Sequence, residues 1–420
     1  MTPHDLTGSG DRTVAPGEIV LGLQGTVDYE IAWDREAIDT LIAEYGIDQG
    51  EIDAGIAVVD ERTLLISVLG FLATGVGGER HVATSEIVER FAARFPREIT
   101  LGGTGVRAAL VLRKLGIPSL LHLVSTDENV RRLLPDDIDH ITSATHDTLD
   151  PHLIIQFRPG DGARVGDREY TVSEANRLII ANDPPAANLV LSDDLGDRVG
   201  ASRVFLISGF NAIADEAILR RRLDEIRAVA RRLPEGGISV YEDAGFHNAG
   251  FQPTVSDAIG PVVDVFSMNE DELQTRLGRA LDLRDAAQIE EALHELRARI
   301  PDPVLVVHTR YWTAVWASAS RERILDRVAT AADAGDATAA GRYAHGDDVT
   351  AADIDAIAAG PRQAESVAFA SDLEARLGPR SRVLPGFDVA APSPTTIGLG
   401  DTFIGGLIGA LAHASERILS

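Results

Sequence analysis

The sequence predicts an α/β protein in which a large parallel sheet, covered by helices on both faces, carries a smaller, mainly antiparallel sheet as a lid. Two features of the chain lead to this prediction. In the second half, short apolar runs alternate with amphipathic stretches, as strands and helices do when they follow each other in turn. Between residues 148 and 182, apolar runs are instead separated by glycine-containing turns, which is typical of hairpins.

Four apolar runs in the second half are predicted to be strands of the large sheet. They cover residues 204–208, 238–241, 262–266 and 304–307. Each is almost continuously apolar, as expected for parallel strands that are buried on both faces. Helices are expected between them, over 215–233 and 285–299. Because ligands bind at the carboxyl ends of such strands, the polar residues that follow these runs are candidates for a binding site.

The lid is predicted from the hairpin signals. Residues 153–157 and 177–181 are expected to be strands, with turns at residues 159–162 and 166–167 between them. The stretch 19–34 near the start of the chain is expected to join the same small sheet.

The domain boundaries follow from this division. We expect one folded unit over residues 1–420, with a lid formed by about 24–100 in part and by 148–182, and a large domain formed by about 101–147 and 183–420. The segment 329–341, rich in alanine, glycine and aspartate, is expected to be a surface loop.

The composition excludes several classes of protein. The net charge of −26 argues against nucleic-acid binding, because phosphate backbones select basic surfaces. There is no cysteine for disulfide or thiolate chemistry, and no apolar stretch long enough to cross a bilayer. The polar start of the chain does not look like a signal peptide, so we expect a cytoplasmic enzyme. Lys114 is the only lysine, so phosphate contacts would have to come from arginine, backbone N–H groups or a metal ion.

The segment Gly-Leu-Gly-Asp at residues 398–401 precedes an apolar helix predicted over 403–413. Gly398 and Gly400 let the backbone approach a ligand closely, and consecutive N–H groups at a helix start form an anion site. Asp401 placed there can accept a hydroxyl proton while the N–H groups hold the charge of a transferring phosphoryl group. The alternative is a tight turn in which Asp401 is an ordinary helix cap.

Acidic residues follow two of the predicted strands. Asn269 and Glu272 stand at the start of a predicted helix with the spacing of a capping box. A purely structural role in capping this helix is therefore one interpretation. Their functional interpretation is a hydrated Mg²⁺ site, because magnesium keeps several waters and uses one or two carboxylates. Glu242 ends the preceding strand and is either a second such acid or a solvated strand end.

A glycine-rich segment that includes Gly102 and Gly103 runs into a helix predicted over 106–115. Its spacing is not that of a dinucleotide-binding loop, so a close-packing turn or backbone contact with a neutral sugar is the better interpretation. No metal-ligand spacing connects the histidines that we considered: His122, His140, His146, His247, His294 and His345. The sequence also contains neither a G-x-S-x-G elbow nor a P-loop.

Taken together, ordered segments of the chain resemble the ADP-dependent glucokinase and phosphofructokinase family, a branch of the ribokinase-like kinases. The resemblance runs from about Val20 to the C-terminus. The segments that carry it are Val27-Asp28, residues 75–79 ending in Glu79, the glycines of 102–105, residues 151–154 with His152, residues 175–179, the N-x-x-E of 269–272 and the G-x-G-D of 398–401. The chain departs from the family in having Val240 where the H-x-E histidine is expected, and Gln24 and Thr26 where asparagines are expected.

The resemblance implies a ribokinase-like fold and phosphoryl transfer from ADP to glucose or fructose 6-phosphate. It assigns the catalytic base and the anion site to Gly398, Gly400 and Asp401, and the organisation of Mg²⁺ to Glu242, Asn269 and Glu272. The residues expected to bind the sugar are Asp28, Glu79, Gly102, Gly103 and His152, with Arg158 and Arg177 flanking the lid strands as possible partners of a 6-phosphate. Because carboxylates suit hydroxyl groups and repel a phosphate, glucose is favoured, with fructose 6-phosphate close behind.

Two alternatives remain open at this point. An ATP-dependent carbohydrate kinase of the wider ribokinase group would share the fold and the G-x-G-D segment. A catalytically silent sugar- or nucleotide-binding protein on the same fold is the second alternative. Its support is the loss of the H-x-E histidine, where this chain has Val240. The expected partners are a small sugar and a nucleotide, with no nucleic acid and no membrane; the sequence makes no prediction of the oligomeric state.

Overall fold

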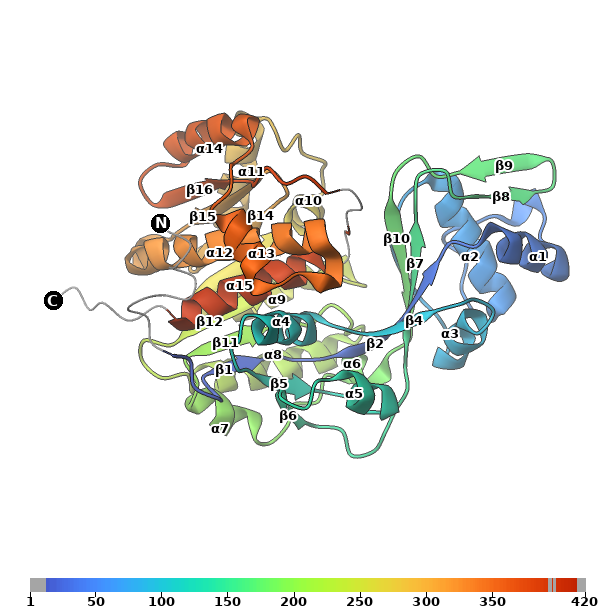
Figure 1. Ribbon diagram of the computed structural model, residues 1–420. Coiled ribbons are helices and arrows are strands. Elements are labelled where there is room, and N and C mark those ends of the chain that lie inside the picture. Colours follow the sequence, from blue (N-terminus) through green and yellow to red (C-terminus); the bar gives the residue numbers. More distant parts are fainter. Residues whose placement is uncertain (1–12, 392–394, 396–397, 414–420) are drawn as a thin grey trace.

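The computed structural model describes residues 13–391, 395 and 398–413. It has two lobes, each built on its own sheet (Figure 1). Thr396 and Ile397, which precede the predicted catalytic segment, lie outside the described residues.

The larger lobe contains a sheet of nine strands among the described residues, in the order β16-β15-β14-β13-β12-β11-β1-β5-β6. All pairings from β6 to β14 are parallel, and only the two strands at the other edge, β15 and β16, add antiparallel pairings. The strands are β1 (Ile19–Leu21), β5 (Leu120–Leu123), β6 (Asp139–Thr142), β11 (Val204–Ile207), β12 (Ile238–Glu242), β13 (Val265–Asn269), β14 (Val304–His308), β15 (Trp312–Trp316) and β16 (Ser381–Pro385). The predicted parallel sheet is therefore confirmed.

The core lies in two layers, one on each face of this sheet. Successive strand residues alternate between them: Leu206 packs in one core and Phe205 and Ile207 pack in the other. One face is covered by α4 (Thr104–Lys114), α12 (Leu325–His345) and α15 (Leu399–His413). The other is covered by α8 (Glu216–Ala230), α9 (Gln252–Ile259), α10 (Glu270–Leu277), α11 (Ala286–Arg299) and α14 (Ala364–Leu377). This is the three-layer arrangement that the alternating pattern predicted.

Helix boundaries follow local capping chemistry. The predicted helix over 215–233 is α8, and the Asp215 side chain accepts hydrogen bonds from the N–H groups of Ala217 and Ile218. The helix over 285–299 is α11, capped in the same way by Asp285. The strand predicted over 262–266 begins only at Val265, because residues 260–262 form a 3₁₀ turn that starts Gly-Pro.

The prediction of a surface loop over 329–341 is wrong, because this segment is the middle of α12 and is largely buried. Its small residues serve close packing against α15 and not flexibility. A Cβ atom at Gly335 would lie 2.8 Å from the backbone oxygen of Phe403, closer than real Cβ contacts allow. Alanine, which is abundant here, also has the highest helix propensity.

The smaller lobe contains a five-stranded sheet in the order β3-β10-β7-β2-β4, and a separate hairpin. The pairings β10–β7 and β2–β4 are antiparallel, whereas β3–β10 and β7–β2 are parallel. The strands are β2 (Thr26–Ala32), β3 (Gly78–His81), β4 (Glu98–Gly102), β7 (His152–Phe157) and β10 (Asn176–Ala181), and the hairpin is β8 (Gly162–Val165) and β9 (Arg168–Thr171). Helices α1 (Arg35–Tyr45), α2 (Glu61–Thr74) and α3 (Ser85–Ala92) pack in this lobe (Figure 1).

The stretch 19–34, which we expected to lie wholly in the small sheet, is divided between the lobes. Residues Ile19–Leu21 form β1 in the middle of the large sheet, and only β2 reaches the small one. β2 and β4 connect the two lobes, pairing with each other from Thr26 and Gly102 outward (Figure 1). As a result, the carboxyl ends of the large-sheet strands face the small sheet across a cavity.

Candidate active site

A cavity of about 970 Å³ lies where the two lobes meet. It is lined from the large lobe by residues at the ends of β12, β13 and β14 and at the start of α15, and from the small lobe by β2, β3, β7 and β10. All the site residues that the sequence predicted line this cavity except Gly102 and Arg158. Those that line it are Asp28, Glu79, Gly103, His152, Arg177, Glu242, Asn269, Glu272, Gly398, Gly400 and Asp401.

Asp401 lies in the first turn of α15, which begins at Leu399, four residues earlier than predicted. It is therefore inside the helix, and the interpretation of Asp401 as an ordinary cap does not describe its position. Gly398 takes a left-handed backbone conformation with φ +65°, which favours glycine, and its oxygen accepts a hydrogen bond from the Thr402 N–H. The N–H groups that precede Thr402 lie at the start of the helix, where backbone N–H groups generally lack an intrahelical partner, and this is the basis of an anion site.

Asp28 faces the same cavity from β2. Its Oδ1 accepts a hydrogen bond from Thr26 Oγ1 at 2.8 Å, and its Oδ2 lies 3.0 Å from Nη2 of Arg107. Nε of Arg107 lies 3.7 Å from Oδ2 of Asp401, so one guanidinium group stands between the two carboxylates. The neighbouring Gly102 does not line the cavity, but a Cβ there would lie 2.2 Å from Asp28 Oδ2; Gly102 therefore makes room for this carboxylate.

Glu242 ends β12 and is buried beside His308, to which the sequence analysis assigned no individual role. Oε1 of Glu242 lies 3.2 Å from Nε2 of His308, and Oε2 is buried without a hydrogen-bond partner. Burial lowers the pKa of His308 to about 4, so the imidazole is neutral at ordinary pH. Burial, helped by repulsion from Asp401, raises the pKa of Glu242 well above its usual range, although the nearby Ser267 hydroxyl opposes the shift. His308 also stacks on the ring of Phe403, with centroids 4.2 Å apart.

Asn269 and Glu272 form the capping box at the start of α10. The side chain of Asn269 accepts from the N–H groups of Asp271 and Glu272, and Oε2 of Glu272 accepts from the N–H of Asn269 at 2.7 Å. The structural interpretation of this pair is therefore confirmed. Burial, and then the charge of Glu242, raises the pKa of Glu272 well above its usual range.

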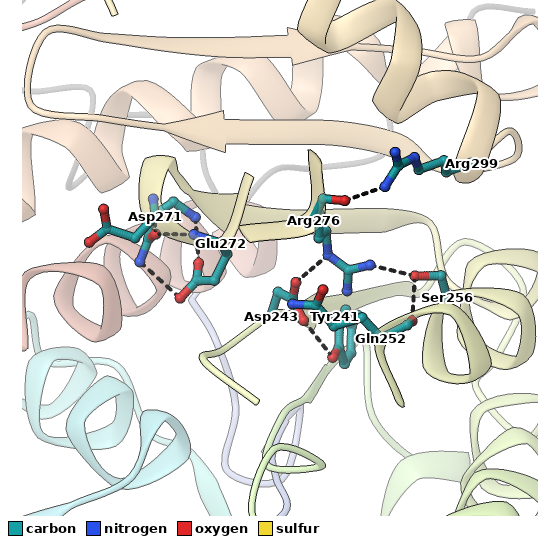
Figure 2. A network of polar contacts seen from close by, with 9 residues as sticks. Tyr241, Asp243, Gln252, Ser256, Asp271, Glu272, Arg276 and Arg299 are labelled. Atoms are coloured by element: carbon teal, nitrogen blue, oxygen red, sulfur yellow. Dashed lines mark hydrogen bonds and ion pairs between the residues drawn. The ribbon is translucent and has the colours of Figure 1, made fainter. Parts of the chain in front are cut away.

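The end of β12 is held by a buried ion pair (Figure 2). Nε of Arg276 lies 2.5 Å from Oδ2 of Asp243, and its Nη1 donates to Ser256 Oγ at 2.7 Å. The hydroxyl of Tyr241 donates to Oδ1 of Asp243 at 3.0 Å. The Asp243 side chain is fully buried and that of Arg276 is 5% exposed, so this network fixes the backbone on which Glu242 stands.

The small lobe contributes a second wall. His152 lies beside Asp28 in the register of β2 and β7, and its Nε2 is 3.1 Å from Oδ2 of Asp183. Although burial opposes it, the hydrogen bond and the charge of Asp183 raise the pKa of His152. Glu79 reaches across to the large lobe, where its Oε2 lies 3.3 Å from Nε2 of His247.

The two arginines expected near a 6-phosphate have different surroundings. Arg177 lines the cavity from β10, two residues from Ile179, which pairs with Glu79. Arg158 follows β7, is exposed and does not line the cavity. The sequence placed both arginines next to lid strands and could not tell them apart. Successive side chains of a strand point to opposite faces, and Arg158 lies just beyond the end of β7.

Sequence reasoning missed Arg107 and Arg276, and it gave His308 and Asp243 no individual role. Arg107 was inside a helix that we treated only as the continuation of a glycine loop, and its partners are 79 and 294 residues away in the chain. His308 directly follows the run 304–307 and Asp243 follows Glu242, so both were among the polar residues expected at the ligand-binding edge of the sheet. What they contact could not be read from their position alone.

The residues present fit a hydrated cation better than a directly bound one. Among the described residues, no group of three or more histidines and acids is close enough to hold a metal ion. Burial raises the pKa values of both Glu242 and Glu272, helped by the charge of Asp401 at Glu242 and by that of Glu242 at Glu272, and Glu242 keeps a buried oxygen without a hydrogen-bond partner. A hydrated cation next to these carboxylates would stabilise their charged forms, and one of its waters would give the Glu242 oxygen a hydrogen-bond partner.

Known proteins resemble this chain in sequence family and in fold. The conserved region of the ADP-specific phosphofructokinase/glucokinase family matches residues 17–403. A search of curated protein sequences gave no match. Among solved structures, a phosphofructokinase from Pyrococcus horikoshii OT3 with AMP is similar with a TM-score of 0.74 at 18% identity, covering 96% of this chain and 99% of that chain.

Two further structures are similar over nearly the whole chain. The last common ancestor of ADP-dependent phosphofructokinases from Methanosarcinales has a TM-score of 0.74 at 16% identity, covering 96% of this chain and 95% of that chain. An ADP-dependent kinase in complex with fructose 6-phosphate and ADPβS has a TM-score of 0.72 at 15% identity, with the same two coverages. At these identities the similarity shows a shared fold.

Replacing Arg276 by methionine should destabilise the protein by about 3–5 kcal/mol, because Asp243 would remain buried without its counter-charge. The matched control is Arg279→Met, which removes a partly exposed pair with Glu295 and should destabilise the protein much less. Thermal and urea unfolding of both variants measure the difference. Equal stability of the two variants would contradict the importance given to the buried network.

Proposed function

Because the chain belongs to the ADP-specific phosphofructokinase/glucokinase family, we propose that it transfers the β-phosphoryl group of ADP to a hydroxyl group of a hexose, giving AMP and a sugar phosphate. The observation that carries the proposal is that Asp401 and the first turn of α15 open into the same cavity as Asp28 and Glu79. A proton acceptor, a set of backbone N–H donors and hydroxyl-binding carboxylates therefore share one enclosed space. Phosphoryl transfer requires mainly such positioning and charge neutralisation.

Asp401 is proposed to accept the proton of the attacking hydroxyl group. The N–H groups of the first turn of α15 face the transferring phosphoryl group and stabilise its negative charge. The small lobe covers the site and excludes water, which would otherwise compete with the sugar as acceptor.

A Mg²⁺ ion is proposed to be held through waters by Glu242 and Glu272, with Asn269 orienting the second of these. When bound, it supplies positive charge next to the diphosphate. The protein's own part is to keep the two carboxylates at the cavity wall: His308 contacts Glu242, and Asn269 holds Glu272 in the capping box. Because Asn269 is engaged in the cap, we assign it a positioning role.

Glucose is the proposed acceptor. Asp28 and Glu79 present carboxylate oxygens to the cavity, and His152 stands beside Asp28. Such a wall suits a neutral polyol with several hydroxyl donors. Fructose 6-phosphate is the second candidate, supported by Arg177, which lines the cavity from the strand next to that of Glu79.

A matrix of donors and acceptors tests the proposal. ADP, ATP, GDP and pyrophosphate are each combined with glucose and fructose 6-phosphate, and the products are identified. We expect turnover with ADP and glucose in the presence of Mg²⁺. Turnover with ATP alone would support an ATP-dependent carbohydrate kinase, and sugar binding by calorimetry without turnover in any pair would support a silent binding protein.

Asp401→Asn should lower kcat by about 10²–10⁴-fold, the usual effect of losing a general base, because the amide keeps the shape but cannot accept the proton. Sugar and nucleotide binding should change much less. Measuring kcat and the melting temperature on the same sample separates chemistry from folding. A folded variant with unimpaired kcat would rule out this role.

Glu272→Gln should keep the helix cap, because glutamine also fits a capping box, while it removes a negative charge from the cavity. We expect a higher Mg²⁺ concentration for half-maximal turnover and weaker binding of Mg²⁺ measured by calorimetry. Glu270→Gln is a matched control on the same helix turn, since Glu270 is not assigned to the ion. An unchanged Mg²⁺ dependence in Glu272→Gln would leave this residue with a capping role only.

Replacing each of two lid residues in turn should change the KM values for glucose and fructose 6-phosphate differently. Glu79→Ala should raise the KM for glucose more than that for fructose 6-phosphate, because a carboxylate that accepts hydrogen bonds from the sugar hydroxyl groups is lost. Arg177→Met should do the reverse, because a partner of the phosphate is lost. Steady-state kinetics with both sugars on both variants measure this. Intact glucose kinetics in Glu79→Ala, or turnover of fructose 6-phosphate alone by the wild type, would overturn the preference for glucose.

A further inference from the structure

Arg107 places a positive charge among three carboxylates at the floor of the cavity. It projects from α4, and its Nη2 lies 3.0 Å from Oδ2 of Asp28 and 3.8 Å from Oε1 of Glu30, while its Nε lies 3.7 Å from Oδ2 of Asp401. The Arg107 side chain is 13% exposed, so these contacts are largely shielded from water. Shielding strengthens both the repulsion among the carboxylates and their attraction to the arginine.

The three connected elements come from distant parts of the fold. Asp28 belongs to β2 of the small sheet, Asp401 to α15 of the large lobe, and Arg107 to α4. No local structure fixes the distance between the two aspartates. Thr26 holds Oδ1 of Asp28, so the ion pair with Arg107 determines where its other oxygen points.

We propose that Arg107 is a positioning residue for phosphoryl transfer, holding the carboxylates of Asp28 and Asp401 at a fixed separation so that a hydroxyl group bound by the first faces the second. This inference rests on the proposed function. A guanidinium group suits the task, because its planar fork presents several donors at fixed angles and can contact two carboxylates at once. Two facing carboxylates without it would repel each other and turn apart.

Arg107 also packs against the turn before α15. A Cβ atom at Gly398 would lie 3.1 Å from Nη1 of Arg107, so the absence of a side chain at Gly398 lets the guanidinium approach. The same arginine therefore lies next to the base and next to the backbone that is proposed to receive the phosphoryl group. A purely structural ion pair would not need to open into the cavity, as Arg107 does.

The test compares Arg107→Met with Arg113→Met. Methionine keeps most of the length of the side chain and removes its charge. Arg113 lies on the same helix but pairs with Asp137 at the surface, so its variant controls for the loss of an arginine from α4. We expect kcat of Arg107→Met to fall about 10²-fold, as for a displacement of about 1 Å between reacting groups, with an unchanged KM for ADP. The control should keep its kcat.

Chemical rescue distinguishes positioning from folding. Free guanidinium chloride at non-denaturing concentration should restore part of the rate of Arg107→Ala, whereas tetramethylammonium chloride at equal ionic strength should not. Arg107→Lys should recover less than the wild-type rate, because the ammonium group lacks the fork. Adding Arg107→Met to Asp28→Asn should cost less than in the wild-type background, because the two residues act as a unit.

A wild-type kcat in folded Arg107→Met overturns the inference and leaves the proposed function intact. A loss of melting temperature without loss of kcat, or a rate that guanidinium does not restore in Arg107→Ala, also overturns it. A wild-type protein without turnover for any donor overturns the proposed function, and this inference with it.

Discussion

The site depends on how the protein holds several carboxylates together in a partly buried space. Carboxylates this close repel each other, and burial makes their charged forms costly. Arg107 stands between Asp28 and Asp401, and Arg276 pairs with Asp243 behind the end of β12. Glu242 and Glu272 are left with raised pKa values, and Glu242 has a buried oxygen without a partner. The cavity thus has one part in which arginine compensates the carboxylates and another in which burial disfavours the charged forms of Glu242 and Glu272.

Much of the fold could be predicted because continuous apolar runs separated by amphipathic stretches have few other structural solutions. The runs at 204–208, 238–241 and 304–307 became β11, β12 and β14 with shifts of one residue at most. The errors arose where composition was used in place of periodicity. Residues 329–341 looked like a loop because they are small and polar, yet their size is what lets α12 approach α15. The stretch 19–34 looked like one unit because the sequence does not mark where β1 ends and the chain crosses to the small sheet.

The site could be predicted only as far as position along a strand determines it. Glu242, Asn269 and Asp401 were found because they follow apolar runs or precede a helix, and such places meet at one edge of the sheet. Arg107 could not be found this way, because its role depends on Asp28 and Asp401 arriving from other elements. Arg158 was predicted to bind the sugar phosphate because it follows a lid strand. Position next to a strand does not say toward which side a side chain points, and Arg158 is exposed outside the cavity. The histidine expected beside Glu242 within β12 is absent, and His308 of β14 places an imidazole next to that carboxylate.

The most direct test of the account follows the phosphorus atom itself. Purified protein is incubated with ADP labelled in the β-phosphate, glucose and Mg²⁺, and the labelled products are separated. The account predicts that the label passes into a hexose phosphate and that one AMP appears for each sugar phosphate formed. Label that is released as inorganic phosphate, or that remains in ADP while the same protein phosphorylates glucose from ATP, would contradict it.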